Sequence, residues 1–363
     1  MPTAPPTPAA APAPLTWRGL AWPVALSAGV LAGVLWLTWE PGTFRQMAGV
    51  LRPLPLALAA LTIPGYLVVG ALRLRYISHG HLRFRGALRG QVAWDFMSAV
   101  TPSAIGGAPL ASYFVAKDND LPVGEATALM LFSMLTDQLW FALSVVLLGV
   151  AALFLPVFPE ASGVTGAIAL AGYGIGFMTW TAFFAYAVVV NPAVLERALL
   201  WVVRLPLLRR FEGRVREEAV SMKRRSAMIR GEKPGFFLAG AGFAAAVWLL
   251  RYLTVVLVAW SVVPDLDALL ALVRTAGMWL TALVVPTPGG SGGIEGLFLL
   301  FVAPILPDDL VGPVLLVWRL LAYHLIIVIG LGVAAQLVGK RVAAGRVADG
   351  PPVPDAAPDA RRP

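Results

Sequence analysis

The sequence contains no cysteine, so it forms no disulfide bond and offers no thiolate for catalysis or metal binding. It is also poor in charge: Asp, Glu, Lys and Arg make up 13% of its 363 residues, about half the share in soluble domains. A soluble surface needs more charge than 20 acidic and 28 basic residues supply, which excludes a soluble globular protein. Because 58% of the residues are hydrophobic, a disordered chain is excluded as well.

Apolar residues are what the chain has in abundance, with a mean hydropathy of +0.78. At about 20 apolar residues per crossing, the length allows roughly six to eight crossings of a membrane. The net charge is +8. In a membrane protein such an excess indicates basic residues on the cytoplasmic side, in contact with anionic lipid, and not a nucleic-acid partner.

Six apolar stretches are long enough to span a membrane as helices. They lie at about 20–38, 54–74, 122–150, 163–190, 236–263 and 311–338. The first stretch lacks a small-residue cleavage site, so we expect a retained helix and not a signal peptide. The ends at 1–17 and 346–363 are predicted to be disordered tails, which leaves 18–345 as a single transmembrane domain.

Two further apolar stretches, 87–116 and 268–303, are interrupted by proline and glycine at 101–109 and 286–293. Either residue type stops a helix. Each arm has roughly 10 to 18 residues, and most such arms are shorter than the hydrocarbon core of about 30 Å.

Loop charges predict the orientation. Basic residues dominate the segments 73–89 and 191–235 and the end of the last span. In 156–162, 264–267 and 304–310 every charged residue is acidic. By the positive-inside rule the basic segments are cytoplasmic. If 87–116 crossed the membrane, the loops 73–89 and 156–162 would lie on the same side, although their charges place them on opposite sides. If 268–303 crossed it, the acidic loops 264–267 and 304–310 would lie on opposite sides. We therefore expect six full spans, two re-entrant helical hairpins, and both termini in the cytoplasm.

The segment 191–235 carries eleven Lys or Arg and five Glu. Its apolar residues recur at three- and four-residue spacing, at Leu207, Leu208, Phe211, Val215, Ala219 and Met222. This pattern predicts a basic amphipathic helix that contacts anionic inner-leaflet lipid over about 207–230. A solvated charged helix between two spans is the alternative.

The two interruptions match each other 186 residues apart: Thr101-Pro102 corresponds to Thr287-Pro288, and Gly106-Gly107 to Gly292-Gly293. Each interruption is preceded by a span and an entry arm and is followed by a span. The two repeats therefore cover about 54–150 and 236–338. Because the two hairpins enter from opposite faces, we expect an inverted-topology repeat, which is typical of secondary transporters.

Non-helical backbone at membrane depth is tolerated where it is buried in protein or lines a polar cavity. Free N–H groups of short helices beside glycine suit an anion such as phosphate. The candidate substrate-binding residues of the interruptions are Thr101, Pro102, Gly106, Gly107, Pro288, Gly289, Gly290, Gly292 and Gly293. The alternative is that these turns only allow tight helix packing.

Ionisable residues inside apolar stretches are costly and usually face a cavity or a partner. Glu295, Arg319 and Tyr323 are candidate substrate contacts, with an ion pair between Glu295 and either Arg274 or Arg319 as the alternative. Arg251 and Asp137 are candidates for direct substrate contact as well, with mutual neutralisation across the bundle as the alternative. The expected intramembrane charge network comprises Asp95, Asp137, Arg251, Arg274 and His324. No catalytic motif or metal-ligand spacing occurs, so we expect neither an enzyme nor a cofactor or metal.

The run Val285-Pro286-Thr287-Pro288-Gly289-Gly290-Ser291-Gly292-Gly293-Ile294-Glu295, followed by Trp318-Arg319-Leu320 and Tyr323, resembles a signature of a known family. That family is the lysylphosphatidylglycerol synthase transmembrane region, also called flippase-like. Pro102, Gly106, Gly107 and Asp137 resemble its first signature, although Ser98, Thr101 and Ser133 stand where the family often has other residues.

The resemblance implies a lipid transporter of the bacterial inner membrane. It would move a polar or anionic lipid, of the phospholipid or aminoacylated phosphatidylglycerol class, between leaflets. The chain ends after its last span, so we expect a stand-alone member without the soluble aminoacyl-transferring domain. Two alternatives are an ion-coupled transporter of a small solute and a non-transporting lipid-binding accessory protein for a membrane glycosyltransferase or synthase. A homo-oligomer and a lipid-synthesising enzyme partner are both open.

Overall fold

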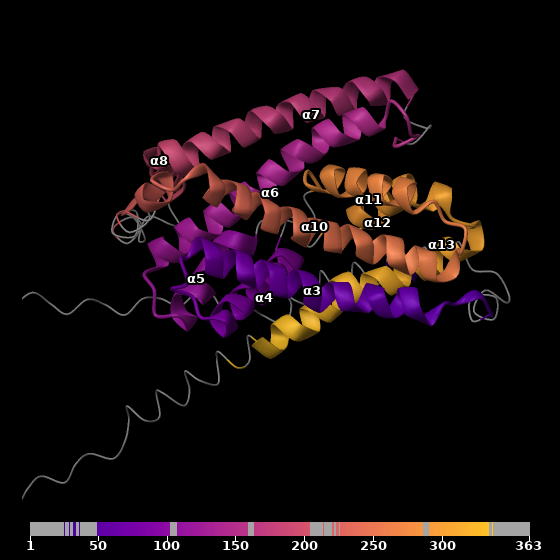
Figure 1. The fold of residues 1–363 in the computed structure, drawn as a ribbon, viewed down its shortest axis with the longest axis horizontal. Helices are drawn as coiled ribbons and strands as arrows, with labels where there is room; N and C mark the ends of the chain where they lie inside the picture. Colours follow the sequence, from indigo (N-terminus) through magenta and orange to yellow (C-terminus); the bar gives the residue numbers. More distant parts are fainter. Residues whose placement is uncertain are drawn as a thin grey trace, which may run out of the picture.

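The computed structural model describes residues 49–101, 107–158, 163–203, 226–285 and 290–333, with a few isolated positions outside these ranges. Within these ranges every regular element is a helix, so the predicted all-α class is confirmed. The helices form an elongated bundle in which most elements run along the long axis (Figure 1).

Five helical segments are long and apolar enough to cross a membrane, which confirms a multi-pass membrane protein. They are α3 (Pro53–Ile77), α6 (Val123–Ala151), the segment Ala171–Val190, α10 (Pro234–Val262) and the segment Asp308–Val333. Ala171–Val190 combines most of α7 (Gly163–Ala185) with the π-helical turn η2 (Tyr186–Val190), and Asp308–Val333 begins with α13 (Asp308–Arg319) and the π-helical turn η5 (Leu320–His324).

Two of the predicted segments lie almost wholly outside the described residues. They are the expected first span at 20–38 and most of the expected amphipathic segment at 207–230. The part of 191–235 that is described begins with α8 (Ala193–Val203).

Helices α3 and α10 form the central pair and run antiparallel along their whole length. At one end the backbone N–H of Arg52, just before α3, donates to the carbonyl of Ser261 in the last turn of α10, at 2.7 Å. At the other end the ring of Tyr76, near the end of α3, stacks on Phe236 in the first turn of α10, with centroids 5.2 Å apart. Thr62 and Thr254 bond between these two ends, at 2.7 Å.

The first interrupted stretch forms two shorter helices, α4 (Phe84–Val100) and α5 (Gly107–Asp118), which pack antiparallel. Arg89 in α4 donates to Asp118 at the end of α5, with Nε and Oδ2 2.6 Å apart. Gly86 packs directly against Asn119. Both helices therefore have their outer ends beside the C-terminal end of α3.

The second interrupted stretch also forms a pair of short antiparallel helices, α11 (Ala268–Ala282) and α12 (Gly293–Phe301), followed by the short helix η4 (Ala303–Ile305). Asp267 caps α11, since its carboxylate accepts from the N–H groups of Leu269 and Leu270, each at 3.0 Å. Leu266 and Leu306 share one apolar cluster with the C-terminal end of α10. The α4–α5 pair therefore begins and ends at the end of the bundle where α3 finishes. The α11–α12 pair begins and ends at the opposite end, where α10 finishes.

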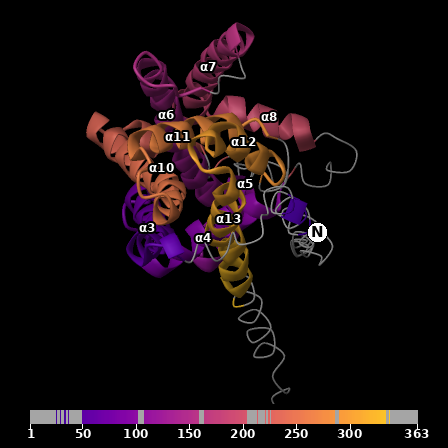
Figure 2. The ribbon, with the colours of Figure 1, turned by 90° about the vertical axis from the view of Figure 1, so that its right-hand side faces the viewer.

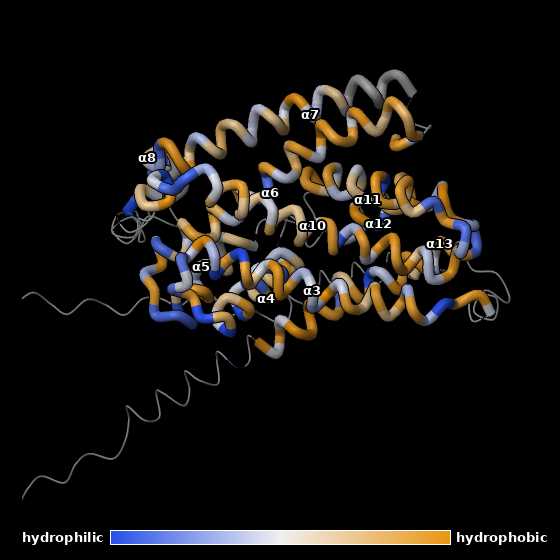
Figure 3. The backbone as a smooth tube through the Cα atoms, in the orientation of Figure 1, coloured by the Kyte–Doolittle hydropathy of each residue, from blue (hydrophilic) through white to orange (hydrophobic). Residues whose placement is uncertain are grey.

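Hydropathy follows the long axis, with hydrophilic residues gathered at the two ends and apolar residues between them (Figure 3). Helix α7 lies at the periphery, and the view along the bundle shows α6 and α7 projecting from the central group (Figure 2). This distribution is what a protein surrounded by hydrocarbon requires.

Glycine is needed where the first pair of short helices meets. A Cβ atom on Gly107, the first residue of α5, would lie 2.3 Å from the backbone nitrogen of Ser98 and 2.6 Å from the carbonyl oxygen of Trp94. Both contacts involve backbone of α4, which a rotamer change cannot relieve. The glycine therefore sets how closely α5 approaches α4.

We expect Gly107→Ala to lower the stability of the protein by about 1–3 kcal/mol, because overpacking forces two helices apart. Thermal unfolding in detergent measures the effect. Gly296→Ala is the matched control, since Gly296 is exposed in α12 and a Cβ there meets no atom within 4 Å. Equal melting temperatures for the two variants would contradict the close packing.

Candidate functional site

A cavity of about 90 Å³ lies inside the bundle and is lined by α3, α4, α6, α10, α11 and α13 together with the start of α12 and η5. Its wall is formed largely by charged and aromatic residues, which is unusual for the centre of an apolar bundle. They are Tyr66, Arg73, Trp94, Asp95, Asp137, Phe141, Trp248, Arg251, Trp279, Trp318, Arg319 and Tyr323.

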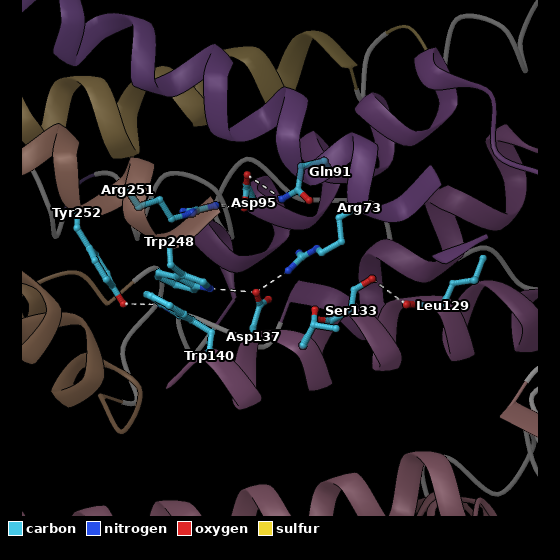
Figure 4. A network of polar contacts seen from close by, with 11 residues as sticks. Arg73, Gln91, Asp95, Leu129, Ser133, Asp137, Trp140, Trp248, Arg251 and Tyr252 are labelled. Carbon is cyan, nitrogen blue, oxygen red and sulfur yellow. Dashed lines mark hydrogen bonds and ion pairs between the residues drawn. The ribbon is translucent and has the colours of Figure 1, made fainter. Parts of the chain in front are cut away.

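Two ion pairs stand on this wall, one buried (Arg73–Asp137) and one partly buried (Arg251–Asp95) (Figure 4). Arg73 of α3 bonds Asp137 of α6, with Nη1 and Oδ1 2.5 Å apart. Arg251 of α10 bonds Asp95 of α4, with Nη2 and Oδ1 2.6 Å apart. The Nε1 of Trp248, one turn before Arg251 in α10, donates to the same Asp137 oxygen at 3.0 Å. A continuous set of polar contacts therefore joins four helices.

The pairing differs from the sequence expectation. Arg251 and Asp137 do not bond each other; each takes another partner, and Trp248 is the residue that stands between their helices. Arg73 was expected in the basic cytoplasmic segment 73–89. Instead α3 continues to Ile77, so Arg73 lies one turn inside the helix with only 1% of its surface exposed.

A third buried pair joins the second interruption to the last span. Glu295, fully buried in the first turn of α12, lies with Oε1 2.9 Å from Nε of Arg319. Its other oxygen accepts the N–H of Gly292 at 2.8 Å, which caps the helix. Gly292 has φ +82°, a left-handed conformation that favours glycine. Of the two pairings considered for Glu295, the structure has the one with Arg319.

Each of the three arginines also faces an aromatic ring. The guanidinium carbon of Arg251 lies 4.1 Å from the ring centre of Tyr66, and that of Arg319 lies 4.1 Å from Tyr323. Arg73 lies 5.1 Å from the ring of Trp94. Such contacts stabilise a cation that has left water.

Tyr323 connects the two interruptions. Its hydroxyl donates to the carbonyl oxygen of Ala99 at 3.3 Å, two residues before the end of the first arm at Thr101. The hydroxyl of Ser291, in the second interruption, donates to Tyr323 at 3.2 Å. Tyr323 belongs to the π-helical turn η5, a form that often occurs at functional sites. The two interruptions therefore meet at one side chain.

The other predicted residues are distributed as follows. Thr101 ends α4, and its hydroxyl bonds the carbonyl of Met97 at 2.6 Å. Gly290 lies in the turn before α12, and Gly293 is the first residue of that helix. Arg274 lies apart from the cavity and donates to the carbonyls of Pro156 and Phe301. His324 contacts the carbonyl of Arg319 at 3.1 Å. Pro102, Gly106, Pro288 and Gly289 lie outside the described residues.

Sequence reasoning missed Arg73, Gln91 and the tryptophans of the cavity. Gln91 donates to Asp95 at 3.3 Å and is itself almost fully buried. One signal was available for this residue: a glutamine inside an apolar arm, four residues before an aspartate, places two polar side chains on the same face of a helix. Trp318 stands in the quoted family signature, but Trp94, Trp248 and Trp279 gave no such signal, because a lone tryptophan in a span is ordinary.

The site is rich in both charges yet holds them in pairs, so it can meet a charged ligand without carrying a large net charge itself. Buried ion pairs add little to stability, because desolvation offsets much of the attraction between the charges. In a membrane such groups usually serve a substrate path or a switch. Among the described residues no group of three His, Asp or Glu side chains is placed to hold a metal ion.

Of three comparisons with known proteins, one identifies a family. The family model described as "Lysylphosphatidylglycerol synthase TM region" matches residues 22–330, which is most of the chain. No curated protein and no solved structure matches the chain.

We expect Arg73→Met to destabilise the protein by about 3–5 kcal/mol, because Asp137 would remain as an unpaired buried charge. Arg73→Met combined with Asp137→Leu is expected to recover most of this loss. Arg89→Met is the control, since the pair with Asp118 is partly exposed and is worth about 1 kcal/mol or less. The midpoints of thermal unfolding of the three variants measure these effects. A double variant as unstable as Arg73→Met would contradict the pairing.

Proposed function

Because the chain belongs to the lysylphosphatidylglycerol synthase transmembrane-region family, a function related to membrane lipids follows, and we propose that the protein moves a lipid between leaflets. The lipid would have a polar or anionic headgroup, of the phospholipid or aminoacylated phosphatidylglycerol class. The headgroup would pass through the central cavity while the acyl chains remain in the bilayer. The proposal includes no catalytic step.

One observation carries this proposal: a cavity lined by paired charges lies midway along an otherwise apolar bundle. A headgroup cannot cross hydrocarbon unaided, because removing a charge from water without a partner is very costly. Fixed arginines and carboxylates replace the lost water contacts.

We further propose that the two halves form an inverted repeat with two re-entrant hairpins. In order, α3, α4, α5 and α6 correspond to α10, α11, α12 and α13. Their first residues are separated by 181 (53 to 234), 184 (84 to 268), 186 (107 to 293) and 185 (123 to 308) positions. The antiparallel packing of α3 on α10, and the opening of the two short pairs toward opposite ends, support this proposal. Transporters of this design bind their substrate where the halves meet.

The proposed location is a bacterial inner membrane, with both termini in the cytoplasm. The end of the bundle where α3 finishes and α4 begins carries Arg75, Arg83 and Arg85, and Lys233 stands before α10 at the same end. The opposite end carries Arg52 before α3, but also four aspartates: Asp265 and Asp267 between α10 and α11, and Asp308 and Asp309 at the start of α13. This asymmetry supports a cytoplasmic basic end.

Transport can be tested by filling the cavity without removing a charge. Ala322 lines the cavity, so Ala322→Trp is expected to block the path and lower lipid exchange at least tenfold. Purified protein is placed in liposomes with acyl-labelled phosphatidylglycerol, and a membrane-impermeant quencher reports the exchange between leaflets. Ala171→Trp, at an exposed position on α7, is the matched control.

Wild-type exchange no faster than in empty liposomes would overturn the proposal. Unchanged exchange in folded Ala322→Trp protein would overturn the path through the cavity. Lipid that binds the protein but does not exchange would favour the accessory-protein alternative.

A further inference from the structure

A second hollow lies at the surface of the bundle. It is a groove of about 880 Å³ at the hydrophilic end where α3 finishes and α10 begins. Its main walls are Leu72, Arg75 and Tyr76 of α3 and Gly235, Phe236 and Phe243 of α10. Among the described residues, none that lines this groove also lines the central cavity, so the two hollows are separate.

The groove runs along the bundle axis, from the hydrophilic end into the apolar part. Phe243 lies nine residues into α10 (234 to 243), which is about 14 Å along the helix. The headgroup layer of one leaflet is only about 5–8 Å thick. The groove is therefore long enough to reach from the headgroup layer into the depth of the acyl chains.

The wall of the groove is aromatic and firmly packed, yet open. The ring of Tyr76 stacks on Phe236 and lies 5.6 Å from the ring of Phe243, and His79 stacks on Phe236 as well, with centroids 5.3 Å apart. Phe236 is buried beneath them, whereas Leu72 and Tyr76 are exposed. A fixed apolar wall of this kind loses little entropy when a chain packs against it.

The outer end of the groove is positively charged. Arg75 and Lys233 stand there, and neither has an acidic partner among the described residues. Glu232 is the one acidic residue of the described lining, and its Oε1 lies 3.2 Å from Nε2 of His79. Its carboxylate is thus already engaged, and two uncommitted cations face an arriving ligand.

From this arrangement we infer that the groove holds an anionic phospholipid of the leaflet at the basic end. Its phosphate contacts Arg75 and Lys233, and one acyl chain lies along Leu72 and Phe243. Charge complementarity selects an anionic lipid, because a zwitterionic headgroup brings no net charge to the two cations. A free phosphate would occupy the outer end alone and leave the apolar wall against water. The site lies outside the proposed transport path and does not depend on it.

Isothermal titration of the full-length protein in detergent tests the inference with three probes: dihexanoyl phosphatidylglycerol, dihexanoyl phosphatidylcholine and glycerol 3-phosphate. The two lipids share their tails, but phosphatidylcholine has no net charge. Glycerol 3-phosphate carries the anion without the tails. We expect phosphatidylglycerol to bind the groove at least tenfold more tightly than either of the others. The titration also gives the number of sites, so a lipid bound elsewhere is counted separately.

Arg75→Gln combined with Lys233→Gln is expected to weaken phosphatidylglycerol binding at the groove at least tenfold, since each basic residue near a membrane surface strengthens the attraction to anionic lipid about fivefold. Arg83→Gln combined with Arg85→Gln is the matched control. It removes the same charge from exposed positions at the same end, and neither residue lines the groove. Arg75→Lys combined with Lys233→Arg keeps both charges and is expected to bind as the wild type does.

Filling the groove without changing its charge is an independent test. Gly235 lines the groove, and a Cβ atom there meets no atom within 4 Å, so Gly235→Leu is expected to weaken phosphatidylglycerol binding about tenfold by occupying the space of the lipid. Gly242→Leu is the matched control, since Gly242 is exposed on the same helix, has equally open surroundings and does not line the groove.

Equal binding of phosphatidylglycerol and phosphatidylcholine would overturn the inference, because charge would then select nothing. An equal loss in the Arg75/Lys233 and Arg83/Arg85 variants would overturn it as well, since general surface charge would explain the binding. Glycerol 3-phosphate that binds as tightly as phosphatidylglycerol would replace the lipid by a soluble anion. Lipid binding at the groove without exchange between leaflets leaves the inference standing and removes the proposed transport, whereas exchange with no loss of binding in the groove variants does the reverse.

Discussion

An arginine in an apolar interior requires a partner, and this requirement organises the centre of the protein. Arg73, Arg251 and Arg319 each pair with one carboxylate and lie over at least one aromatic ring. The partners come from different helices, so satisfying the charges also fixes how α3, α4, α6, α10, α12 and α13 are rotated toward one another. Apolar packing surrounds this centre, but it does not by itself specify which face of each helix points inward.

The helical interruptions depend on the same centre. Glu295 both pairs with Arg319 and caps α12, and Tyr323 bonds Ala99 and Ser291 across the two interruptions. Backbone groups beside the two interruptions are thus met by side chains: Tyr323 bonds the carbonyl of Ala99, and Glu295 accepts the N–H of Gly292. A Gly-rich turn inside a membrane is tolerable only with such contacts. The π-helical turn of that span places Arg319 and Tyr323 where they can make them.

The sequence predicts the long spans and both interruptions well, because hydropathy, proline and glycine act locally along the chain. The Glu295–Arg319 pair was also within reach, since both residues stand in regions that the family resemblance brings together. The pairing of Asp95 with Arg251 and of Asp137 with Arg73 was not, because it depends on the rotation of helices far apart in the sequence. Arg73 was misplaced because its charge suggested a loop, whereas α3 continues to Ile77 and ends in a turn through Gly80, at φ +79°.

The six paired charges are divided unequally between the two halves of the chain. The first half contributes Arg73, Asp95 and Asp137, a sum of −1, and the second contributes Arg251, Glu295 and Arg319, a sum of +1. The Arg73–Asp137 pair lies within the first half and the Glu295–Arg319 pair within the second. Of the three ion pairs, Asp95–Arg251 is the one that joins the halves. A rocking motion of one half against the other would leave the two pairs within the halves intact. It would change the distance between Asp95 and Arg251. Other contacts also join the halves, among them the hydrogen bonds of Thr62 with Thr254 and of Trp248 with Asp137, but Asp95–Arg251 is the one whose strength an anion beside Arg251 would change.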